Sequence, residues 1–179
     1  MHLIRHGQTT FNAVYDITGR DPLIFDAPLS PLGVEQVAKA AWKIRQLDVE
    51  LIVTTPLTRA LQTAVGLDSG GTTPILVERL HRERVTNSCD VGRSPAVLAA
   101  DFPSLSFRHL PEVWWYEGEK DVRGVAVEPM EIFQRRVDGF RRWLARRDEA
   151  CIVVVGHAEF FAHLTGVKTA NCEMLEWAG

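Results

Sequence analysis

The run at residues 151–155 is the feature that most constrains the fold of this chain. Its residues are apolar without a break and mostly β-branched, a pattern typical of a strand buried on both faces. Such a strand belongs near the centre of a parallel sheet. The run ends at Gly156 and His157, so a histidine stands beside a glycine where the strand stops.

The same arrangement opens the chain. Leu3 and Ile4 are the apolar body of a short strand, and Arg5, His6 and Gly7 follow directly. Ligands of open α/β sheets bind outside the carboxyl ends of the strands, which is where these side chains would lie. A histidine next to an arginine is often only a surface or capping residue, so this segment alone does not establish a function.

Short apolar runs alternate with amphipathic segments between these two strands, which is the pattern of βαβ units. Residues 8–12 can begin a helix, and a long irregular segment is expected from about 16 to 31. Further strands are expected at 51–53 and 74–77, and further helices from 31, at 94–101, from 129 and at about 159–164. The helix from Pro31 would bury Val34, Val37, Ala41 and Ile44. Six arginines in the helix that Pro129 starts are interpreted as a solvated face, and the aromatic residues 114–116 as cover for the core.

The stretch after the second strand, residues 54–64, is also informative. Thr55 is a candidate cap, Pro56 suits the first helical position, and Arg59 then falls near the first turn. Helical side chains lean toward the helix N-terminus, so Arg59 could lie over the free amides and form an anion pocket. A solvated arginine on an amphipathic helix is the alternative.

Charge and cysteine content exclude some classes of protein. The formal net charge of −3 gives no general attraction to nucleic acid or to an anionic membrane. The 3 cysteines show no ligand spacing, which favours free thiols in a reducing compartment. Neither a transmembrane run nor a signal peptide is recognisable. We therefore expect a cytoplasmic protein without nucleic-acid or membrane partners, and its oligomeric state is not indicated.

Arg5, His6, Arg59 and His157 follow three different strands that one parallel sheet would bring to the same edge. Two guanidinium groups, two imidazoles and helix N-termini suit a phosphoryl dianion. No metal-ligand cluster competes with this interpretation, and arginines can stabilise the transferred phosphoryl group without a metal. A small phosphorylated substrate is therefore expected, with no metal and no cofactor.

The chemistry also needs a nucleophile and an acid. Serine and cysteine are not placed for attack, whereas His6 can present one neutral ring nitrogen to phosphorus and form a phosphohistidine. The leaving alkoxide then needs a proton, for which Glu83 is the first candidate. Asp90 and Glu159 remain alternatives.

Four segments together resemble a known family. They are the opening Leu3-Ile4-Arg5-His6-Gly7-Gln8-Thr9 with Asn12, then residues 26–33, 54–64 and 154–157. In this order they resemble the blocks of the histidine phosphatase superfamily, whose members are phosphoglycerate-mutase-like. The resemblance implies one domain over residues 1–179, a three-layer α/β sandwich with a mostly parallel sheet.

The resemblance also implies roles for individual residues. His6 would be the phosphorylated nucleophile, and Arg5, Arg59 and His157 would bind the phosphoryl group. Gln8 and Asn12 would neighbour the phosphate or the substrate, and Glu83 would be the proton donor.

This chain departs from the family after Glu83. Many members continue with an aromatic-glycine and Trp-Glu-Gly pattern, whereas residues 84–92 read Arg-Val-Thr-Asn-Ser-Cys-Asp-Val-Gly. The chain also lacks the inserted segments of the cofactor-dependent mutases, so water should reach the phosphohistidine. We therefore expect a metal-independent phosphatase of phosphomonoesters. A phosphoglycerate mutase and a non-catalytic member that binds a phospho-ligand or a protein are the alternatives.

Overall fold

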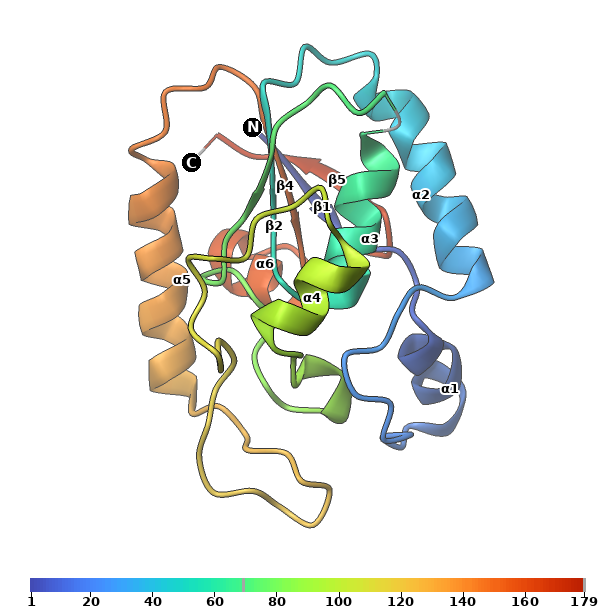
Figure 1. The fold of residues 1–179 in the computed structure, drawn as a ribbon, viewed down its shortest axis with the longest axis vertical. Helices are drawn as coiled ribbons and strands as arrows, with labels where there is room; N and C mark the ends of the chain where they lie inside the picture. Colours follow the sequence, from blue (N-terminus) through green and yellow to red (C-terminus); the bar gives the residue numbers. More distant parts are fainter. Residues whose placement is uncertain (69, 179) are drawn as a thin grey trace.

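The computed structural model describes residues 1–68 and 70–178. Strands and helices alternate through much of the chain, as the sequence predicts (Figure 1). In chain order the elements are β1 (His2–Arg5), α1 (Thr10–Thr18), α2 (Pro31–Ile44), β2 (Leu51–Thr54), α3 (Thr58–Leu67), β3 (Ile75–Val77), a 3₁₀ helix (Ser88–Asp90), α4 (Pro95–Asp101), α5 (Met130–Leu144), β4 (Ile152–Gly156), α6 (Ala158–Thr165) and β5 (Met174–Glu176). None of the helices in this part of the chain is long and apolar enough to cross a bilayer.

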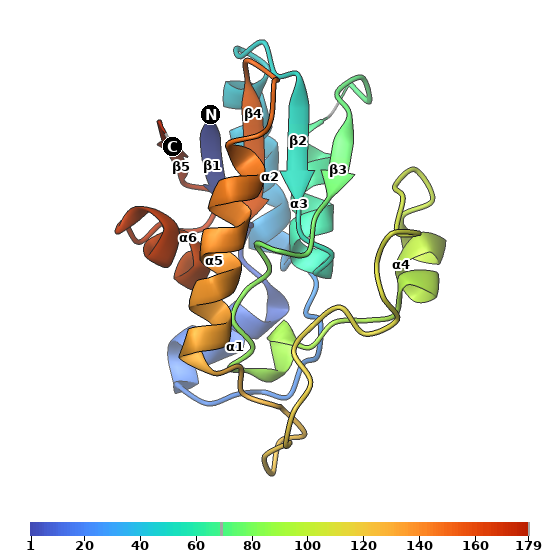
Figure 2. The same cartoon turned by 90° about the vertical axis from the view of Figure 1, so that its left-hand side faces the viewer.

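The described strands form one sheet in the order β3-β2-β4-β1-β5. Neighbouring strands are parallel except β5, which pairs antiparallel with β1 at the edge. β4 lies in the centre, as its unbroken apolar run predicts, with Val154 opposite Leu3 on one side and Val53 on the other (Figure 2). The carboxyl ends of the four parallel strands therefore meet at one edge.

Helices cover both faces of this sheet, which confirms the three-layer α/β sandwich. Ile52 and Val153 pack with α2 and α3, whereas Val53 and Val154 pack with α5 and α6. Successive residues of a strand point to opposite faces, so each apolar strand contributes to two cores. Among the described residues, the core against α5 and α6 combines aliphatic and aromatic side chains, whereas the core against α2 and α3 is built from aliphatic ones.

The first turn of α2 differs from the prediction. Val34 is 58% exposed, while Val37, Ala41 and Ile44 are buried as expected. Gly33 faces inward instead, so close to Gln8 that an added Cβ would lie 2.0 Å from the Gln8 carbonyl oxygen. Because the backbones approach at Gly33, Val34 is turned to the outside.

The start of α3 also differs. The helix begins at Thr58, so Pro56 is not its first residue and Thr55 is not its cap. The carboxylate of Asp26 takes that place, accepting hydrogen bonds from the amide and the hydroxyl of Thr58. A cap from a distant segment leaves no local sequence pattern.

The arginines of α5 do not all lie on a solvated face. Arg135 is exposed as predicted, but Arg136 is only 8% exposed and pairs with the buried carboxylate of Glu128. The prediction was wrong for Arg136 because it follows Phe133 by three positions and so shares the apolar stripe. Trp114 is buried in a core between α3 and α4, which confirms the prediction for that residue.

The irregular segment after α1 is shorter than expected. The helix continues through Asp16 to Thr18 and ends at Gly19, which has the left-handed φ of 63° that favours glycine. Thr9 caps the other end, where its hydroxyl accepts from the amide of Asn12. The longer α1 places Tyr15 and Asp16 at the carboxyl edge of the sheet.

Candidate active site

A cavity of about 240 Å³ lies at the carboxyl edge of the sheet. Its walls come from the end of β1, from α1 and α3, from the segment after β3 and from the start of α6. Of the five residues predicted to attack the phosphoryl group, bind it or donate the proton, four line the cavity, namely Arg5, His6, Arg59 and Glu83. The ring of the fifth, His157, lies 5.2 Å from the ring of His6, centroid to centroid. The structure thus brings these five residues together.

His6 has a defined tautomer. Its Nδ1 lies 2.7 Å from the carbonyl oxygen of Gly7, and because a carbonyl only accepts, Nδ1 carries the proton. Nε2 is then the unprotonated nitrogen, and it accepts a hydrogen bond from Nε of Arg59 at 3.2 Å. Burial, followed by the charges of Arg59 and Arg5, lowers the pKa of His6 well below its usual value. The ring is therefore neutral at pH 7.

The backbone beneath His6 is tightly held. Gly7 donates to the hydroxyl of Thr63, and Asn171 donates to the carbonyl of His6. A Cβ at Gly7 would lie 2.7 Å from the carbonyl oxygen of Gly33, so a larger residue does not fit. His6 is only 5% exposed, so its ring lies inside the site rather than on the surface.

Arg59 is buried in the site rather than solvated, which rules out the alternative interpretation of this residue. Its Nη2 forms an ion pair with Asp90 at 2.9 Å, and Nη1 donates to the carbonyl of Cys89. The second carboxylate oxygen of Asp90 accepts from the amides of Thr86 and Asn87. The guanidinium is therefore oriented from three directions.

Arg5 and His157 are held less completely. Nη1 of Arg5 donates to the carbonyl of Thr169 at 3.0 Å, and Arg5 Nε has no hydrogen-bond partner among the described residues. His157 Nε2 lies 2.8 Å from the hydroxyl of Thr55, while its Nδ1 has no partner within the same part of the chain. Burial and then the charge of Arg59 lower the pKa of His157 well below its usual value. Both residues retain polar atoms for a ligand.

Glu83 differs from the other two candidate acids. Its carboxylate accepts from the amides of Glu159 and Phe160 at the start of α6, each at 3.0 Å. Burial, and next the charge of Asp90, raises the pKa of Glu83 from 4.5 to about 7. Glu159, by contrast, pairs with Arg84 at 3.2 Å, and Asp90 pairs with Arg59. Glu83 is the one of the three without an arginine partner among the described residues.

The predicted substrate neighbours divide into two groups. Asn12 lines the cavity, although its Oδ1 is engaged by the amide of Thr9. The structure does not bring Gln8 there, because its side chain accepts from the hydroxyl of Ser30 at the start of α2. Sequence analysis missed Tyr15 and Asp16, which line the cavity. Their spacing from Asn12, three and four positions, was the available signal.

Cys89 also lines the cavity, although the sequence indicates no cysteine near the reacting group. Burial raises the pKa of its thiol far above the usual value, so it stays protonated and is no nucleophile. In the part of the chain that the structure describes, His, Cys, Asp and Glu form no group of three or more that could hold a metal ion.

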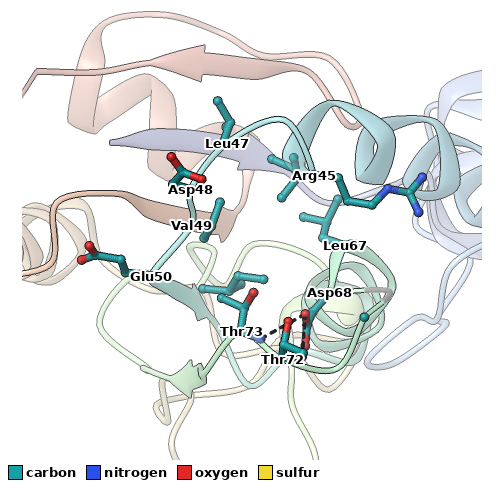
Figure 3. A pocket seen from close by; sticks show the side chains of 12 residues that line it. Arg45, Leu47, Asp48, Val49, Glu50, Leu67, Asp68, Thr72 and Thr73 are labelled. Carbon is teal, nitrogen blue, oxygen red and sulfur yellow. Dashed lines mark hydrogen bonds between the residues drawn. The ribbon is translucent and has the colours of Figure 1, made fainter.

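A larger hollow of about 640 Å³ lies at the opposite edge of the sheet, between the segments that precede β2 and β3 (Figure 3). Asp48, Glu50 and Asp68 border it. The Asp68 carboxylate accepts from the amides of Thr72 and Thr73. None of the predicted site residues lines this hollow, and its carboxylates do not suit a phosphoryl anion.

The fold and the cavity define an α/β protein with two histidines and two arginines at the carboxyl edge of a mostly parallel sheet. The model of the histidine phosphatase superfamily (branch 1) matches residues 1–173. The chain belongs to this family, as its motifs predict.

Similar proteins include phosphatases and mutase-like proteins. A glucosyl-3-phosphoglycerate phosphatase of Mycolicibacterium vanbaalenii is 30% identical over 91% of this chain and 71% of its own length. A phosphoglycerate mutase-like protein of Arabidopsis thaliana is 27% identical over 96% and 75% of the two chains. A solved mycobacterial glucosyl-3-phosphoglycerate phosphatase, in complex with VO3, has a TM-score of 0.63 at 23% identity, over 97% and 88%. At that identity the structural likeness shows the fold alone.

Proposed function

We propose that this protein is a metal-independent phosphatase that hydrolyses phosphomonoesters through a phosphohistidine on His6. The observation that supports this most is the neutral His6 ring, whose unprotonated Nε2 faces the guanidinium of Arg59 at the cavity. A neutral imidazole with a fixed tautomer is a competent nucleophile. Arg5 and Arg59 provide the positive charge that the transferred phosphoryl group requires.

The first step transfers the phosphoryl group to the enzyme. Nε2 of His6 attacks phosphorus, the bond from phosphorus to the ester oxygen breaks, and Glu83 gives its proton to the departing alkoxide. The Arg59 hydrogen bond to Nε2 must be replaced in this step, so Arg59 turns its N–H groups to the phosphoryl oxygens. His157 is neutral, its Nδ1 has no hydrogen-bond partner among the residues that the structure describes, and it provides a further contact.

The second step returns the enzyme to its starting state. Glu83, now a carboxylate, takes a proton from a water molecule whose oxygen attacks phosphorus. The bond between phosphorus and Nε2 breaks, its electron pair returns to His6, and inorganic phosphate leaves. A carboxyl group that acts first as an acid and then as a base works best when its pKa lies near the working pH. The pKa of Glu83, about 7, meets this condition, and the two arginine-paired carboxylates are poorer candidates.

Hydrolysis of an aryl phosphate by the purified protein tests the proposal. We expect turnover that a chelator does not reduce, and a labelled phosphoryl group on histidine when the reaction is stopped in alkali, where phosphohistidine survives. Loss of turnover with the chelator would refute metal independence, and label on another residue would refute the role of His6.

The mutase alternative draws on the names of several relatives. It predicts that phosphoglycerate isomerisation exceeds hydrolysis and depends on a bisphosphoglycerate primer. The non-catalytic alternative predicts phosphate binding without any turnover. A screen of sugar phosphates, phosphoglycerates, nucleotides and phosphopeptides separates the three functions.

A further inference from the structure

A second cavity, of about 410 Å³, adjoins the candidate active site. Arg5, Ala158 and Glu159 line both cavities, and the far wall of the second includes Lys168 and Thr169. We propose that this second cavity, here called the leaving-group cavity, binds the alcohol part of the substrate and selects alcohols that carry an anionic group. The inference rests on the proposed phosphatase function and names the substrate class of that site.

The catalytic cavity is small for a complete substrate. Sites for small molecules usually measure about 300–1,000 Å³. The catalytic cavity measures about 240 Å³, so it holds a phosphoryl group and several further atoms. A larger substrate extends beyond it, and the leaving-group cavity begins at the residues that the two cavities share.

The position of the proposed acid, Glu83, indicates the direction in which the alcohol part of the substrate extends. Glu83 is bound to the amides of Glu159 and Phe160 in the first turn of α6. The departing oxygen must lie within hydrogen-bond distance of Glu83, hence beside that turn. Ala162 and His163, in the next turn of the same helix, line the leaving-group cavity. An alcohol that leaves past Glu83 therefore continues along α6 into this space.

The charges around the leaving-group cavity favour an anion. Arg5 and Lys168 border it, and its carboxylate, Glu159, is paired with Arg84. Arg5 Nε and the hydroxyl of Thr169 have no hydrogen-bond partner among the described residues, and Thr169 is only 5% exposed. Buried polar groups without partners cost free energy, so a ligand with several acceptor oxygens is favoured there. A carboxylate and a second phosphate both carry negative charge and several acceptor oxygens.

A matched set of substrates tests the inference. Butyl phosphate, its ω-carboxy counterpart and butanediol bisphosphate have the same chain length and differ in the charge at the far end. We expect kcat/KM of at least one charged compound to exceed that of butyl phosphate by about tenfold or more, which corresponds to ~1.4 kcal/mol. The better of the two identifies a carboxylate or a phosphate as the preferred group. Equal values for all three would overturn the inference.

Substitutions at Lys168 test whether the anionic group of the substrate binds in the leaving-group cavity. We expect Lys168→Glu to reduce kcat/KM for the charged compounds about tenfold more than for butyl phosphate, and Lys168→Arg to retain the preference. Lys39→Glu, on the exposed face of α2 across the sheet, makes the same charge change and should leave the preference intact. An equal effect of both charge reversals would refute the placement at this cavity.

Binding separates this inference from the proposed function. An ω-carboxyalkyl phosphonate and the matching alkyl phosphonate cannot be hydrolysed, so calorimetry compares them without turnover. Tighter binding of the carboxylated compound, weakened by Lys168→Glu, supports the cavity even if none of the esters is hydrolysed and the proposed function fails. Equal binding of both phosphonates would overturn the inference even if hydrolysis is observed.

Discussion

Nε of Arg59 donates a hydrogen bond to Nε2 of His6 across 3.2 Å. The two residues are 53 positions apart, one at the end of β1 and the other in the first turn of α3. The contact puts a buried cation against the nitrogen that we propose as nucleophile. A phosphoryl group must displace this contact, because the lone pair that attacks phosphorus is the one that accepts from Arg59.

Replacement of the proposed nucleophile gives the first prediction. His6→Ala should reduce kcat for aryl phosphate by about 10⁴-fold or more, since the covalent step is lost. Because His6 is buried, the melting temperature of the variant should be measured together with its kcat, so that loss of activity is distinguished from loss of folding. His109→Ala removes a histidine that also contacts one carbonyl, but in a different part of the fold, and should retain activity. Retained turnover in His6→Ala would refute the phosphohistidine mechanism.

The second prediction concerns the leaving group. Glu83→Gln should reduce kcat/KM for alkyl phosphates by about 10²-fold or more, while aryl phosphates, whose leaving groups need no proton, lose far less. In the wild type the rate with alkyl phosphates should fall as pH rises through about 7, where Glu83 loses its proton. The rate of the Glu83→Gln variant should not show this decrease, here called the alkaline limb of the pH profile. Equal losses for both substrate types would point to Asp90 or Glu159 as the acid.

Asp90 provides the third prediction, which separates binding from turnover. Asp90→Asn removes a negative charge next to Arg59, so inorganic phosphate should bind about tenfold more tightly while kcat falls because Arg59 is less well oriented. The charge of Asp90 also raises the pKa of Glu83, so the alkaline limb should move to lower pH. Asp101→Asn, at an exposed ion pair with Arg93, is the control. An unchanged pH profile together with unchanged phosphate affinity would contradict this role.

The fourth prediction tests the buried arginine of α5. Arg136 pairs with Glu128 and donates to the carbonyls of Arg82 and Glu83, so it fixes the segment that presents the Glu83 carboxylate. Arg136→Ala should lower the free energy of unfolding by about 3 kcal/mol, because the buried carboxylate of Glu128 then keeps only its longer ion pair with Arg82, at 3.2 Å. Arg135→Ala, next to it but exposed, should change it by less than about 0.5 kcal/mol. Similar urea midpoints for the two variants would refute the distinction.

The pH dependence of stability gives the fifth prediction. The pKa of Glu83 is raised from 4.5 to about 7 in the folded state, so the folded chain binds this proton more tightly than the unfolded chain. The stabilisation from this group is fully present below pH 4.5 and is lost as pH rises through about 7. Relative to Glu83→Gln, the wild type should therefore lose unfolding free energy over this interval. Parallel stability curves for the two proteins would contradict the raised pKa.

Much of the fold follows from local patterns. The apolar strands, the helix signals after them and the glycine-histidine strand ends predict a parallel sheet with its site at one edge, and the motifs predict the family. These features depend on the period of side chains along a strand or a helix, which the sequence displays directly. β5 was not predicted, because its sequence, Met-Leu-Glu, has no β-branched residue and ends in a charge. β3 is equally short, but its sequence, Ile-Leu-Val, is typical of a strand.

Local patterns were enough to predict the layers of the fold, the edge that holds the site and the convergence of Arg5, His6, Arg59 and His157. The chemical properties of these residues depend on the packed structure. It set the Arg59 contact with His6, raised the pKa of Glu83 to about 7 through desolvation and the charge of Asp90, and capped α3 with Asp26. These properties arise from contacts between groups that are far apart in the chain. The burial and the electrostatic surroundings of each group depend on its packed neighbours, which a local sequence pattern does not indicate.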